Sequence, residues 1–438
     1  MKAHAYFLAG WVCLASLTSC LTPVDPASPV IVDPQPPLDP SGLVCLIGEP
    51  NGMPAVSATV GPAGGALTTE DGSVRIQIPA GALPGDETIQ IVPIANTNPT
   101  GKGAGYRLEP HGTQFAKPVK LTFTYDEADL EASLAEALQI AYQNEQGVWM
   151  AMPGLVLDKQ AKTITVETTH FSDWTYFTSV VLTPQRCGIR PGETLKLAVH
   201  TTLILDEMLA PLVKDEPIVR LHADQSVPVV AWAISEKIGR LASTGAVSTN
   251  TYTTPTGIVK PTPVTVTAQI KPKGKGLLLL LSSLLIMPEG IAYRLDDGPW
   301  IHRSGTAFRA GGRLISLGGA KPSSGDKDLA VGINIDCSDG ASSLSIPWSS
   351  ATALLFASPV SEYQSYHSYY GPGGNVRISP GGVYLYDIRY APDGYGLNEV
   401  MSMHGGYSVP ILGAYDSYKG YVGAHHFEGY FSYGDINL

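Results

Sequence analysis

The sequence of 438 residues has few charged side chains and no long helical pattern. Asp, Glu, Lys and Arg make up only 15% of the chain, and the formal net charge at pH 7 is −11. Because phosphate groups and anionic lipids attract basic surfaces, this balance argues against nucleic acid as a partner and against electrostatic attraction to lipid. The lack of heptad or helical repeats argues against coiled coils and helical arrays.

Motifs of the common enzyme classes are also missing. The chain contains no Gly-x-Ser-x-Gly, Walker-type phosphate loop, His-Glu-x-x-His or dinucleotide fingerprint. We therefore expect a non-enzymatic protein without a cofactor. Glycosidase carboxylate pairs have no fixed spacing, so the sequence leaves that class open.

Cysteines are few, and their spacing is not that of a metal or redox site. Cys45, Cys187 and Cys337 lie far apart in the chain, without a Cys-x-x-Cys pair. One disulfide can form among these three in an oxidising compartment, which leaves at least one thiol free or paired between molecules.

A metal site was considered at the C-terminal end, where His404, His425, His426 and Glu428 occur. Adjacent histidines on a strand point to opposite faces, so only one of the pair can share a site with Glu428. The usual zinc spacing is missing. We predict that the chain binds no metal.

The first residues have the layout of a secretory signal. A weakly basic start, Met1-Lys2, precedes an apolar run from Ala5 to Leu17. This run is shorter than the roughly 20 apolar residues that a membrane-spanning helix needs. The segment predicts export of the chain.

The run ends in Leu17-Thr18-Ser19-Cys20, which resembles the lipobox of bacterial lipoproteins. The resemblance implies a signal peptide of residues 1–19, cleavage before Cys20, and lipid on Cys20. Two or more acyl chains hold a protein stably on a membrane. The alternative is an ordinary secretory signal with a chance cysteine. Leu21 after Cys20 favours the outer membrane in the enterobacterial sorting pattern.

A proline-rich stretch follows the predicted anchor. Seven residues between Leu21 and Ser41 are proline, which disfavours helix and central strand and favours extended polyproline II. At about 3.1 Å per residue, such a stretch can hold the folded part tens of ångströms from the membrane.

The rest of the chain is typical of a mostly β protein. Gly (47) and Pro (35) are abundant, and Thr, Val, Tyr and Ile recur in short alternating runs between turn residues. We predict tandem β-sandwich domains after the signal peptide and linker. The expected ranges are 1–19 for the signal, 20–50 for the lipidated Cys and linker, and 51–180, 181–290 and 291–438 for three β domains.

The first predicted β domain, 51–180, carries several motifs in a fixed order. Strict alternation at Val74–Pro79 predicts a half-buried strand. The segments Ile78-Pro79-Ala80-Gly81-Ala82-Leu83, Phe115-Ala116-Lys117-Pro118-Val119 and Thr169-His170-Phe171-Ser172 resemble a ZU-five domain, the β-sandwich named for zonula occludens and Unc-five proteins. The resemblance implies a role in protein interaction and assembly.

In some animal members of that family, a His-Phe-Ser sequence at the end of the domain cuts itself. The matching residues are His170, Phe171 and Ser172. The Ser172 hydroxyl would attack the Phe171 carbonyl, with His170 as the local base and a strained peptide with oxyanion donors. The simpler interpretation is that Phe171 and Trp174 close the end of the sandwich while Ser172 and Asp173 form a turn.

The second range, 181–290, resembles bacterial immunoglobulin-like domains. A Trp strand at Val229–Ile234, a Tyr-Thr-x-Pro segment at Thr251–Pro255 and a Thr/Val strand at Val264–Ala268 occur in that order. The resemblance makes Trp232 the core aromatic. The apolar stretch from Leu277 to Ile286 is too short to span a membrane, and we predict a buried terminal strand.

The third range, 291–438, is rich in tyrosine. Its last 78 residues hold 14 of the 21 tyrosines, including Tyr363, Tyr366, Tyr369, Tyr370, Tyr384, Tyr386 and Tyr390. Tyrosine offers apolar area plus a hydroxyl, so this density suits strand faces or a wet surface that binds sugar rings or proteins.

We therefore expect a lipoprotein of the cell envelope, exposed beyond the cytoplasm and at the outer membrane, whose β-sandwiches bind a protein or a surface. One alternative is a self-processing protein that cleaves between Phe171 and Ser172. A second is a carbohydrate-binding surface lipoprotein that uses the Tyr-rich end.

Overall fold

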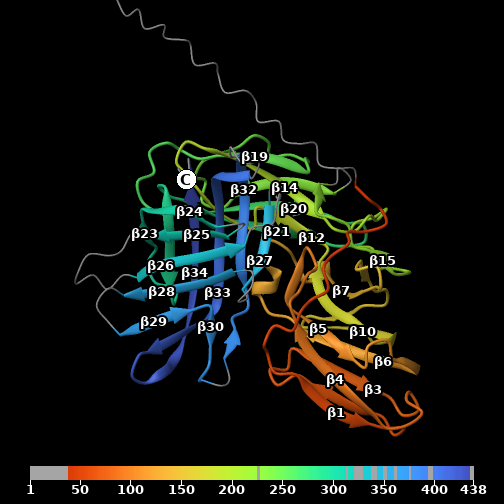
Figure 1. Cartoon of the computed structure of the whole chain (residues 1–438). Helices are drawn as coiled ribbons and strands as arrows, with labels where there is room; N and C mark the ends of the chain where they lie inside the picture. Colours follow the sequence, from red (N-terminus) through yellow and green to blue (C-terminus); the bar gives the residue numbers. More distant parts are fainter. Residues whose placement is uncertain are drawn as a thin grey trace, which may run out of the picture. The chain divides into compact units, whose positions relative to one another are not determined.

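Strands make up nearly all of the regular structure (Figure 1), which confirms the predicted mostly β fold. The computed structural model describes residues 38–223, 227–311, 314–319, 329–336, 343–348, 353–359, 363–373, 376–392 and 398–434. The predicted signal peptide, Cys20, most of the linker and Cys337 lie outside these ranges. Helical turns among the described residues are short: η1 (Ala128–Leu130) and η2 (Ala135–Ala137).

The first sandwich consists of two antiparallel sheets with alternating burial. One sheet has the order β1 (Val56–Val60), β4 (Glu87–Ile94), β5 (Gly101–Glu109), β11 (Asp173–Thr178), β7 (Leu138–Gln143), β8 (Trp149–Ala151), β15 (Glu216–Pro217). The other has the order β2 (Gly65–Thr68), β3 (Val74–Ile78), β6 (Gln114–Thr124), β10 (Thr163–His170), β9 (Val156–Asp158). In β3, Val74, Ile76 and Ile78 are buried while Arg75 and Gln77 are exposed, as the alternation predicts.

The second sandwich also pairs two sheets. One has the order β12 (Val180–Thr183), β14 (Thr194–Thr201), β19 (Thr249–Thr253), β18 (Arg240–Leu241), with β16 (His222–Ala223) beside β14. The other has the order β13 (Arg186–Ile189), β21 (Leu278–Ile286), β20 (Thr262–Ile270), β17 (Val229–Ile234). Trp232 is buried in the core between them and donates its indole N–H to the Val247 carbonyl at 2.7 Å, as expected for the core aromatic.

The leucine-rich stretch forms β21, but the prediction that it is buried holds only in part. Leu280 and Leu284 point into the core, whereas Leu277, Leu279 and Leu281 are about half exposed. The reason is the two-residue period of a strand, which puts alternate leucines on the outer face of the sheet. The strand also lies inside its sheet, between β13 and β20.

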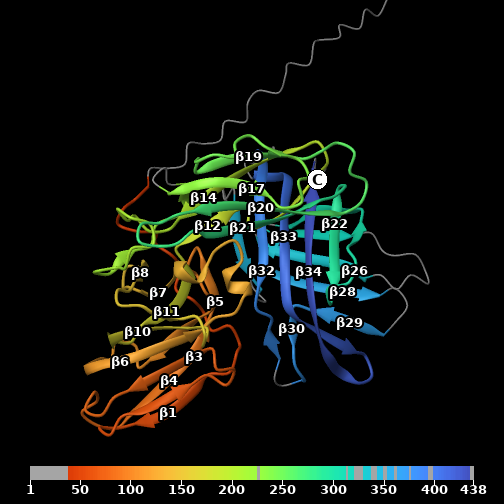
Figure 2. The same cartoon turned by 180° about the vertical axis from the view of Figure 1, so that it is seen from behind.

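The third part is an eleven-stranded sheet, seen from behind in Figure 2. Its main path has the order β23 (Ile301–Arg303), β22 (Gly290–Leu295), β34 (Gly420–Tyr433), β33 (Asn398–Asp416), β29 (Gln364–His367), β28 (Ala353–Pro359), β26 (Leu329–Asp336), β25 (Leu314–Gly319), β24 (Gly305–Gly311). The strands β32 (Gly382–Pro392) and β27 (Ser343–Pro347) extend it beside β33, and β30 (Tyr369–Tyr370) pairs separately with β31 (Arg377–Ile378).

This large sheet folds over so that its distant strands share one core. Ile291 of β22 and Leu317 of β25 belong to the same buried cluster. The backbone N–H of Leu329 donates to the Tyr293 hydroxyl at 2.6 Å, which ties β26 to β22. The opposite face of β25, β26, β28 and β29 is therefore an outer face of the sheet.

The three predicted ranges are joined by shared packing. The strand β15 lies within the range predicted for the second domain but pairs with β8 of the first sandwich. A smaller core combines Trp149 and Phe177 with Leu203 and Ile218. The residues from Asp39 onward form one compact unit.

The last part of the predicted linker, 20–50, is tied into the same region, so the linker is shorter than predicted. The backbone N–H of Leu43 donates to the Ile218 carbonyl, and that of Cys45 donates to the Gly147 carbonyl, both at 2.8 Å. Arg107 also donates to the carbonyl of Gly48. The chain thus enters the fold through backbone hydrogen bonds to two different segments.

Candidate functional site

The His-Phe-Ser sequence lies where the chain crosses between the two sheets of the first sandwich. His170 ends β10 in one sheet, and Asp173 begins β11 in the other. Phe171 is buried and contacts Phe115 edge-on, with ring centroids 4.7 Å apart. Trp174 is also buried in this core, as the packing interpretation expects. Asp173 is a strand residue, which corrects the predicted turn at that position.

The Ser172 hydroxyl is buried and already has a partner. It donates to the Gln143 carbonyl at 2.6 Å. The His170 Nδ1 lies 3.2 Å from the Thr168 hydroxyl. Desolvation lowers the pKa of His170, so the imidazole is neutral at pH 7.

Some of the requirements for self-cleavage are present at this crossover. The Gly112 backbone N–H donates to the Phe171 carbonyl at 3.1 Å, which supplies one donor where an oxyanion would form. The residues 170–172 have neither a positive φ nor a cis peptide bond. Because the Ser172 hydroxyl donates to the Gln143 carbonyl and not to a base, this segment is arranged as a tightly packed connection between the two sheets. Self-cleavage stays a prediction for experiment.

The residues considered for a metal site have other partners. Glu428 is bound by Arg186 and Arg294, and His425 pairs with Asp296 at 2.6 Å. The His404 Nδ1 lies 2.9 Å from the Ser432 hydroxyl. In the described part of the chain, no three His, Cys, Asp or Glu side chains lie close enough to hold a metal ion.

Two of the three cysteines in the folded part are described. Cys187 is buried on β13, and Cys45 is half-buried and forms no disulfide with a described residue. Burial raises the pKa of the Cys45 thiol to about 11. The thiol is therefore protonated at neutral pH and is a poor nucleophile.

A buried cluster of charges joins the three parts of the fold. Arg186 of β13 lies between two carboxylates: its Nε is 2.5 Å from Glu131, and its Nη1 contacts Glu428. Glu428 of β34 also binds Arg294 of β22. All but Arg294 are largely buried. We call Glu131, Arg186, Glu428 and Arg294 the charged junction.

Aromatic rings cover the cations of the charged junction. The Arg186 guanidinium lies 5.7 Å from the centre of the Tyr430 ring, and that of Arg294 lies 5.0 Å from Trp300. Burial raises the pKa of Glu131 despite Arg186. Burial also works to raise the pKa of Glu428, but the two arginines outweigh it and hold this pKa below its usual value.

Further titratable groups of the first sandwich adjoin the charged junction. Desolvation raises the pKa of Asp129 to about 6, although its carboxylate accepts a hydrogen bond from the Tyr176 hydroxyl at 2.8 Å. Desolvation lowers the pKa of the buried Lys102, whose charge faces Asp129 and Glu131. Perturbed groups often mark reactive sites, but these are buried between packed elements, which favours a structural role.

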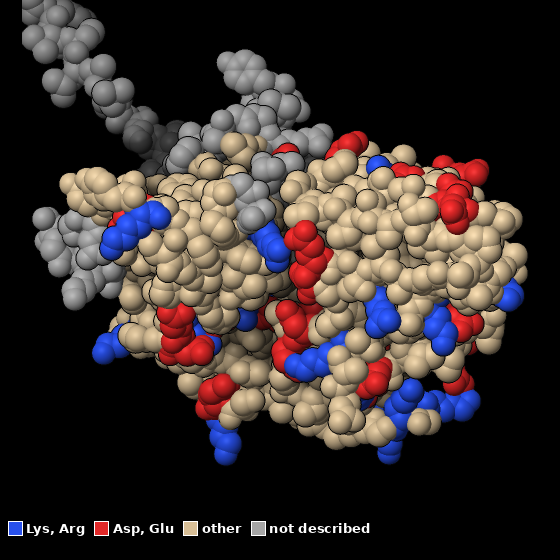
Figure 3. Space-filling view, turned by 90° about the horizontal axis from the view of Figure 1, so that it is seen from below, with Lys and Arg blue, Asp and Glu red and all other residues tan. Residues whose placement is uncertain are grey.

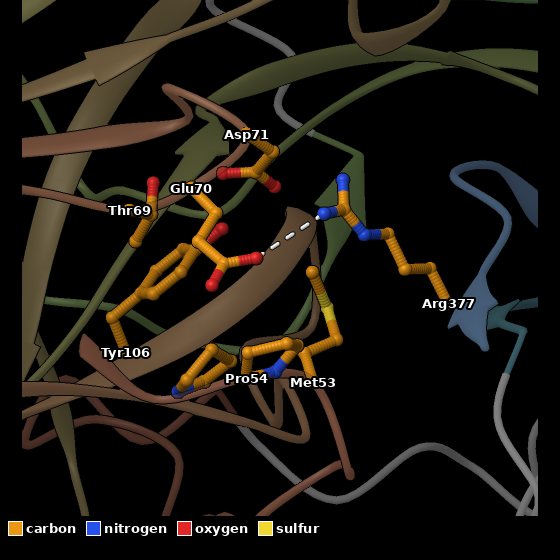
Figure 4. Close-up of a pocket in the computed structure, with 8 residues that line it drawn as sticks. Met53, Pro54, Thr69, Glu70, Asp71, Tyr106 and Arg377 are labelled. Carbon is orange, nitrogen blue, oxygen red and sulfur yellow. Dashed lines mark hydrogen bonds and ion pairs between the residues drawn. The ribbon is translucent and has the colours of Figure 1, made fainter. Parts of the chain in front are cut away.

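A small surface pocket lies between the turn after β2 and the strand β31 (Figure 4). Its empty space is about 250 Å³, and it is open to solvent. Arg377 points across it to the Glu70 carboxylate at 3.3 Å. Burial works to raise the pKa of Asp71, but hydrogen bonds from Ser73 outweigh it and lower this pKa. The opposed charges occupy the space, so the pocket offers little room for a ligand.

The tyrosines of the C-terminal part divide into core and surface groups. Tyr384, Tyr407, Tyr430 and Tyr433 are buried. Tyr363 and Tyr418 are exposed and contact each other edge-on, with centroids 5.2 Å apart. Further tyrosines are half-buried: Tyr366, Tyr369, Tyr370, Tyr415 and Tyr421. Tyrosine therefore fills strand faces in the core and also lies at the surface, and recognition of a ligand by the surface tyrosines stays a prediction.

Four rings on or beside the outer face of the large sheet contact one another, and Phe356 lies on a neighbouring strand of that face. Phe356 of β28 is paired directly with His367 of β29, so the two side chains share a face. The His367 ring stacks on Tyr369 at 4.5 Å and meets Tyr415 at 5.5 Å, and Tyr415 meets Tyr421 at 5.5 Å. We call Phe356, His367, Tyr369, Tyr415 and Tyr421 the aromatic strip.

Glycines support the rings of the aromatic strip. A Cβ on Gly332 of β26 would lie 2.3 Å from Cζ of Phe356, so the ring lies directly over the glycine backbone. Phe356 is nevertheless 49% exposed. One face of its ring therefore packs on the sheet, and the other is available to solvent. A Cβ on Gly413 would likewise collide with the Tyr369 carbonyl oxygen, at 2.1 Å.

The strands around Phe356 are almost free of charge. β25, β26, β28 and β29 contain one charged residue, Asp336, at the end of β26. Desolvation lowers the pKa of His367, which is neutral at pH 7. Figure 3 shows acidic and basic side chains interspersed over the face seen from below, with uncharged areas between them. Around Phe356, the strip is an uncharged surface with one exposed ring, and its other rings are half-buried.

Sequence reasoning found only part of this site. The tyrosine density pointed to the right region, but Phe356, His367 and Gly332 were not singled out. Phe356 stands in Ala353-Leu354-Leu355-Phe356-Ala357, an apolar run in which periodicity does not reveal the outer face. Glu131, Arg186 and Glu428 were also missed as a group, because they are distant in sequence.

Comparisons with known proteins do not place the chain in a family. No protein-family model matches it, and no curated protein sequence matches it. The resemblances to lipoproteins, ZU-five domains and immunoglobulin-like domains therefore rest on the sequence motifs. Over the described ranges, no helix has the length and apolar character needed to cross a membrane.

Proposed function

We propose that this protein is a lipid-anchored, exported lipoprotein of the cell envelope at the outer membrane that binds a ligand through the aromatic strip and carries out no turnover. Cys20 is the lipidated residue, residues 1–19 are the signal peptide, and the proline-rich stretch is the stalk. The β-sandwiches act as a rigid scaffold that supports the binding surface.

The proposal that the protein binds a ligand rests on one observation, the exposure of the Phe356 ring on an outer face of the large sheet. A large aromatic ring that is about half exposed gains little for folding, and exposed apolar patches mark interaction sites. The half-buried rings of His367, Tyr369, Tyr415 and Tyr421 extend this surface across neighbouring strands.

The proposal that the protein is lipid-anchored is supported by the order of its N-terminal segments. A basic start, an apolar run, the Leu17–Cys20 motif and a proline-rich stretch follow one another directly. A lipid followed by an extended stalk is a coherent tether. The charged junction supports a rigid arrangement of the β parts, since it connects the residue after η1 in the first part to strands of the other two.

The anchor is tested by metabolic labelling with radioactive palmitate and by cell fractionation. We expect the full chain to be labelled and to sediment with membranes, and Cys20→Ser to be unlabelled and absent from the membrane fraction. A matched control is Cys45→Ser, which should be labelled like the unaltered chain. Equal labelling of Cys20→Ser and the unaltered chain would contradict the proposal.

A further inference from the structure

We infer that the aromatic strip binds a neutral glycan, a chain of uncharged pyranose sugars. This inference rests on the proposed binding function and adds the chemical class of the ligand. It combines two observations: a row of rings with an exposed, flat-lying Phe356, and strands around it that carry almost no charge.

The way in which Phe356 is mounted suits a sugar ring. An aromatic face carries partial negative charge, and the C–H groups on one face of a pyranose carry partial positive charge, so the two rings stack face to face. This requires an aromatic ring that lies flat with one free face. Gly332 makes that possible, because any Cβ at this position would displace the Phe356 ring.

The row of rings also has a suitable spacing. Phe356, His367, Tyr415 and Tyr421 come from β28, β29, β33 and β34, which are neighbours in the sheet. The ring centroids of His367 and Tyr415, and those of Tyr415 and Tyr421, are 5.5 Å apart, close to the length of one sugar unit. Because these rings meet edge-on, at 68° and 60°, one sugar stacks on the free face of Phe356, and further sugars of the same glycan contact the edges of the other rings.

The polarity of the strip favours a neutral ligand. Several polar side chains that share this face of the sheet are uncharged, among them Ser316, Asn334 and Ser365, and Asp336 lies at its edge, at the end of β26. Ser316 donates to the Asn334 side-chain oxygen at 2.7 Å, and Ser365 lies 3.0 Å from Nε2 of His367. Hydroxyl and amide groups of this kind match sugar hydroxyls, whereas an acidic glycan would need cations.

A protein partner fits these strands less well. Protein interfaces centre on aromatic and Arg anchors that fill pockets. The strands β25, β26, β28 and β29 contain neither Arg nor Lys.

The test is isothermal titration calorimetry of the full chain in detergent with four neutral hexasaccharides: cellohexaose, chitohexaose, maltohexaose and mannohexaose. We expect at least one to bind and Phe356→Ala to weaken this binding at least tenfold. Leu279→Ala is the matched control, because Leu279 is 50% exposed on the outer face of another sheet. Its affinity should equal that of the unaltered chain.

A second variant guards against loss of folding. Gly332→Val keeps Phe356 but pushes its ring off the sheet, and it should also weaken binding tenfold or more while the far-UV circular dichroism stays unchanged. Absence of binding to all four hexasaccharides overturns the inference. So does binding that Phe356→Ala and Gly332→Val both leave unchanged, since the sugar then lies elsewhere.

A parallel measurement separates this inference from the proposed function. The full chain is incubated with envelope fractions of the expressing cells, untreated or digested with proteinase K. Retention that survives digestion and is lost in Phe356→Ala supports a glycan. Retention that digestion abolishes overturns the glycan in favour of a protein ligand and leaves the proposed function standing. No retention on either fraction contradicts the binding function itself.

Discussion

The charged junction and the aromatic strip are opposites in composition and position. The junction places Arg186 and two carboxylates in the interior, covered by Tyr430 and Trp300. The strip places a phenylalanine ring on the outside, among uncharged strands. In most proteins, charges favour the surface and large apolar rings favour the core. Here, each region reverses that tendency.

The difference separates a region that serves the fold from the region that we propose as a ligand-binding surface. Buried charges are costly unless they are paired, so the junction can exist only while all its partners are in place. It therefore fixes how the β parts meet. We expect the strip to have no such role in folding, because the half-exposed Phe356 ring contributes little to the stability of the fold. Mutations should separate the two regions clearly by their effect on stability.

The largest expected effect is that of Arg186→Met. Removing this guanidinium leaves Glu131 without its cation in the interior, and Glu428 keeps only Arg294. We expect the free energy of unfolding to fall by about 3–5 kcal/mol, as measured by urea denaturation. Lys120→Met is the control, since Lys120 and Glu167 form an exposed pair 3.9 Å apart. Similar losses for both variants would remove the contrast between junction and surface.

The next largest effect is the dependence of the free energy of unfolding on pH, which we attribute to Asp129. Its pKa is raised to about 6 in the folded chain, against about 3.9 when unfolded. The folded state therefore binds this proton more tightly, and stability falls as pH rises from about 4 to about 6. Asp129→Asn should abolish this fall and stabilise the fold at pH 7 by on the order of 2 kcal/mol. The measurement is urea unfolding at pH 4, 5, 6 and 7.

A contrary result for Asp129 would be equally informative. Its carboxylate also faces Asp126, Lys102 and Tyr176. If Asp129→Asn keeps the full pH dependence between 4 and 6, Asp129 is not the group responsible, and Glu131, whose pKa burial also raises, is the next residue to substitute.

A smaller effect is expected at the crossover between sheets. Ser172→Ala removes one buried hydrogen bond, to the Gln143 carbonyl, and should cost about 1 kcal/mol of stability. On a denaturing gel, we expect one full-length band for both the unaltered chain and this variant. Two fragments that disappear in Ser172→Ala would instead establish self-cleavage between Phe171 and Ser172.

The smallest effect on stability is expected at the strip. Phe356→Ala should change the free energy of unfolding by less than Phe171→Ala, for which about 3–5 kcal/mol is typical of a buried ring. Both can be measured by urea denaturation under one set of conditions. Equal losses would mean that Phe356 is a structural residue, and the contrast with the junction would disappear.

The first two sandwiches were largely predictable because their strands alternate without interruption. Val74–Ile78 and Thr194–Thr201 alternate strictly between buried and less buried residues, and Trp232 lies in the core as expected. Phe171 packs at the end of its sandwich, where the sequence placed it. Local pattern and tertiary packing agree in these elements.

The large sheet was harder to predict, for a local and a non-local reason. The 19-residue strand β33 is interrupted by register shifts, for example between Val409 and Leu412. A shift of one residue exchanges the two faces of a strand, so a fixed period of two fails there. The non-local reason is that the register between β28 and β29, which brings Phe356 beside His367, is not encoded in either segment alone.

The backbone hydrogen bonds of Leu43 and Cys45 bear on how the protein would carry mechanical load. Tension applied along the chain from an anchor reaches the fold at these two residues. Their bonds to Ile218 and Gly147 divide the force between two segments. Shear flow or the pull of a bound polymer would then strain the hydrogen bonds of Leu43 and Cys45 first. The Phe356 ring over Gly332 would keep its position on the sheet.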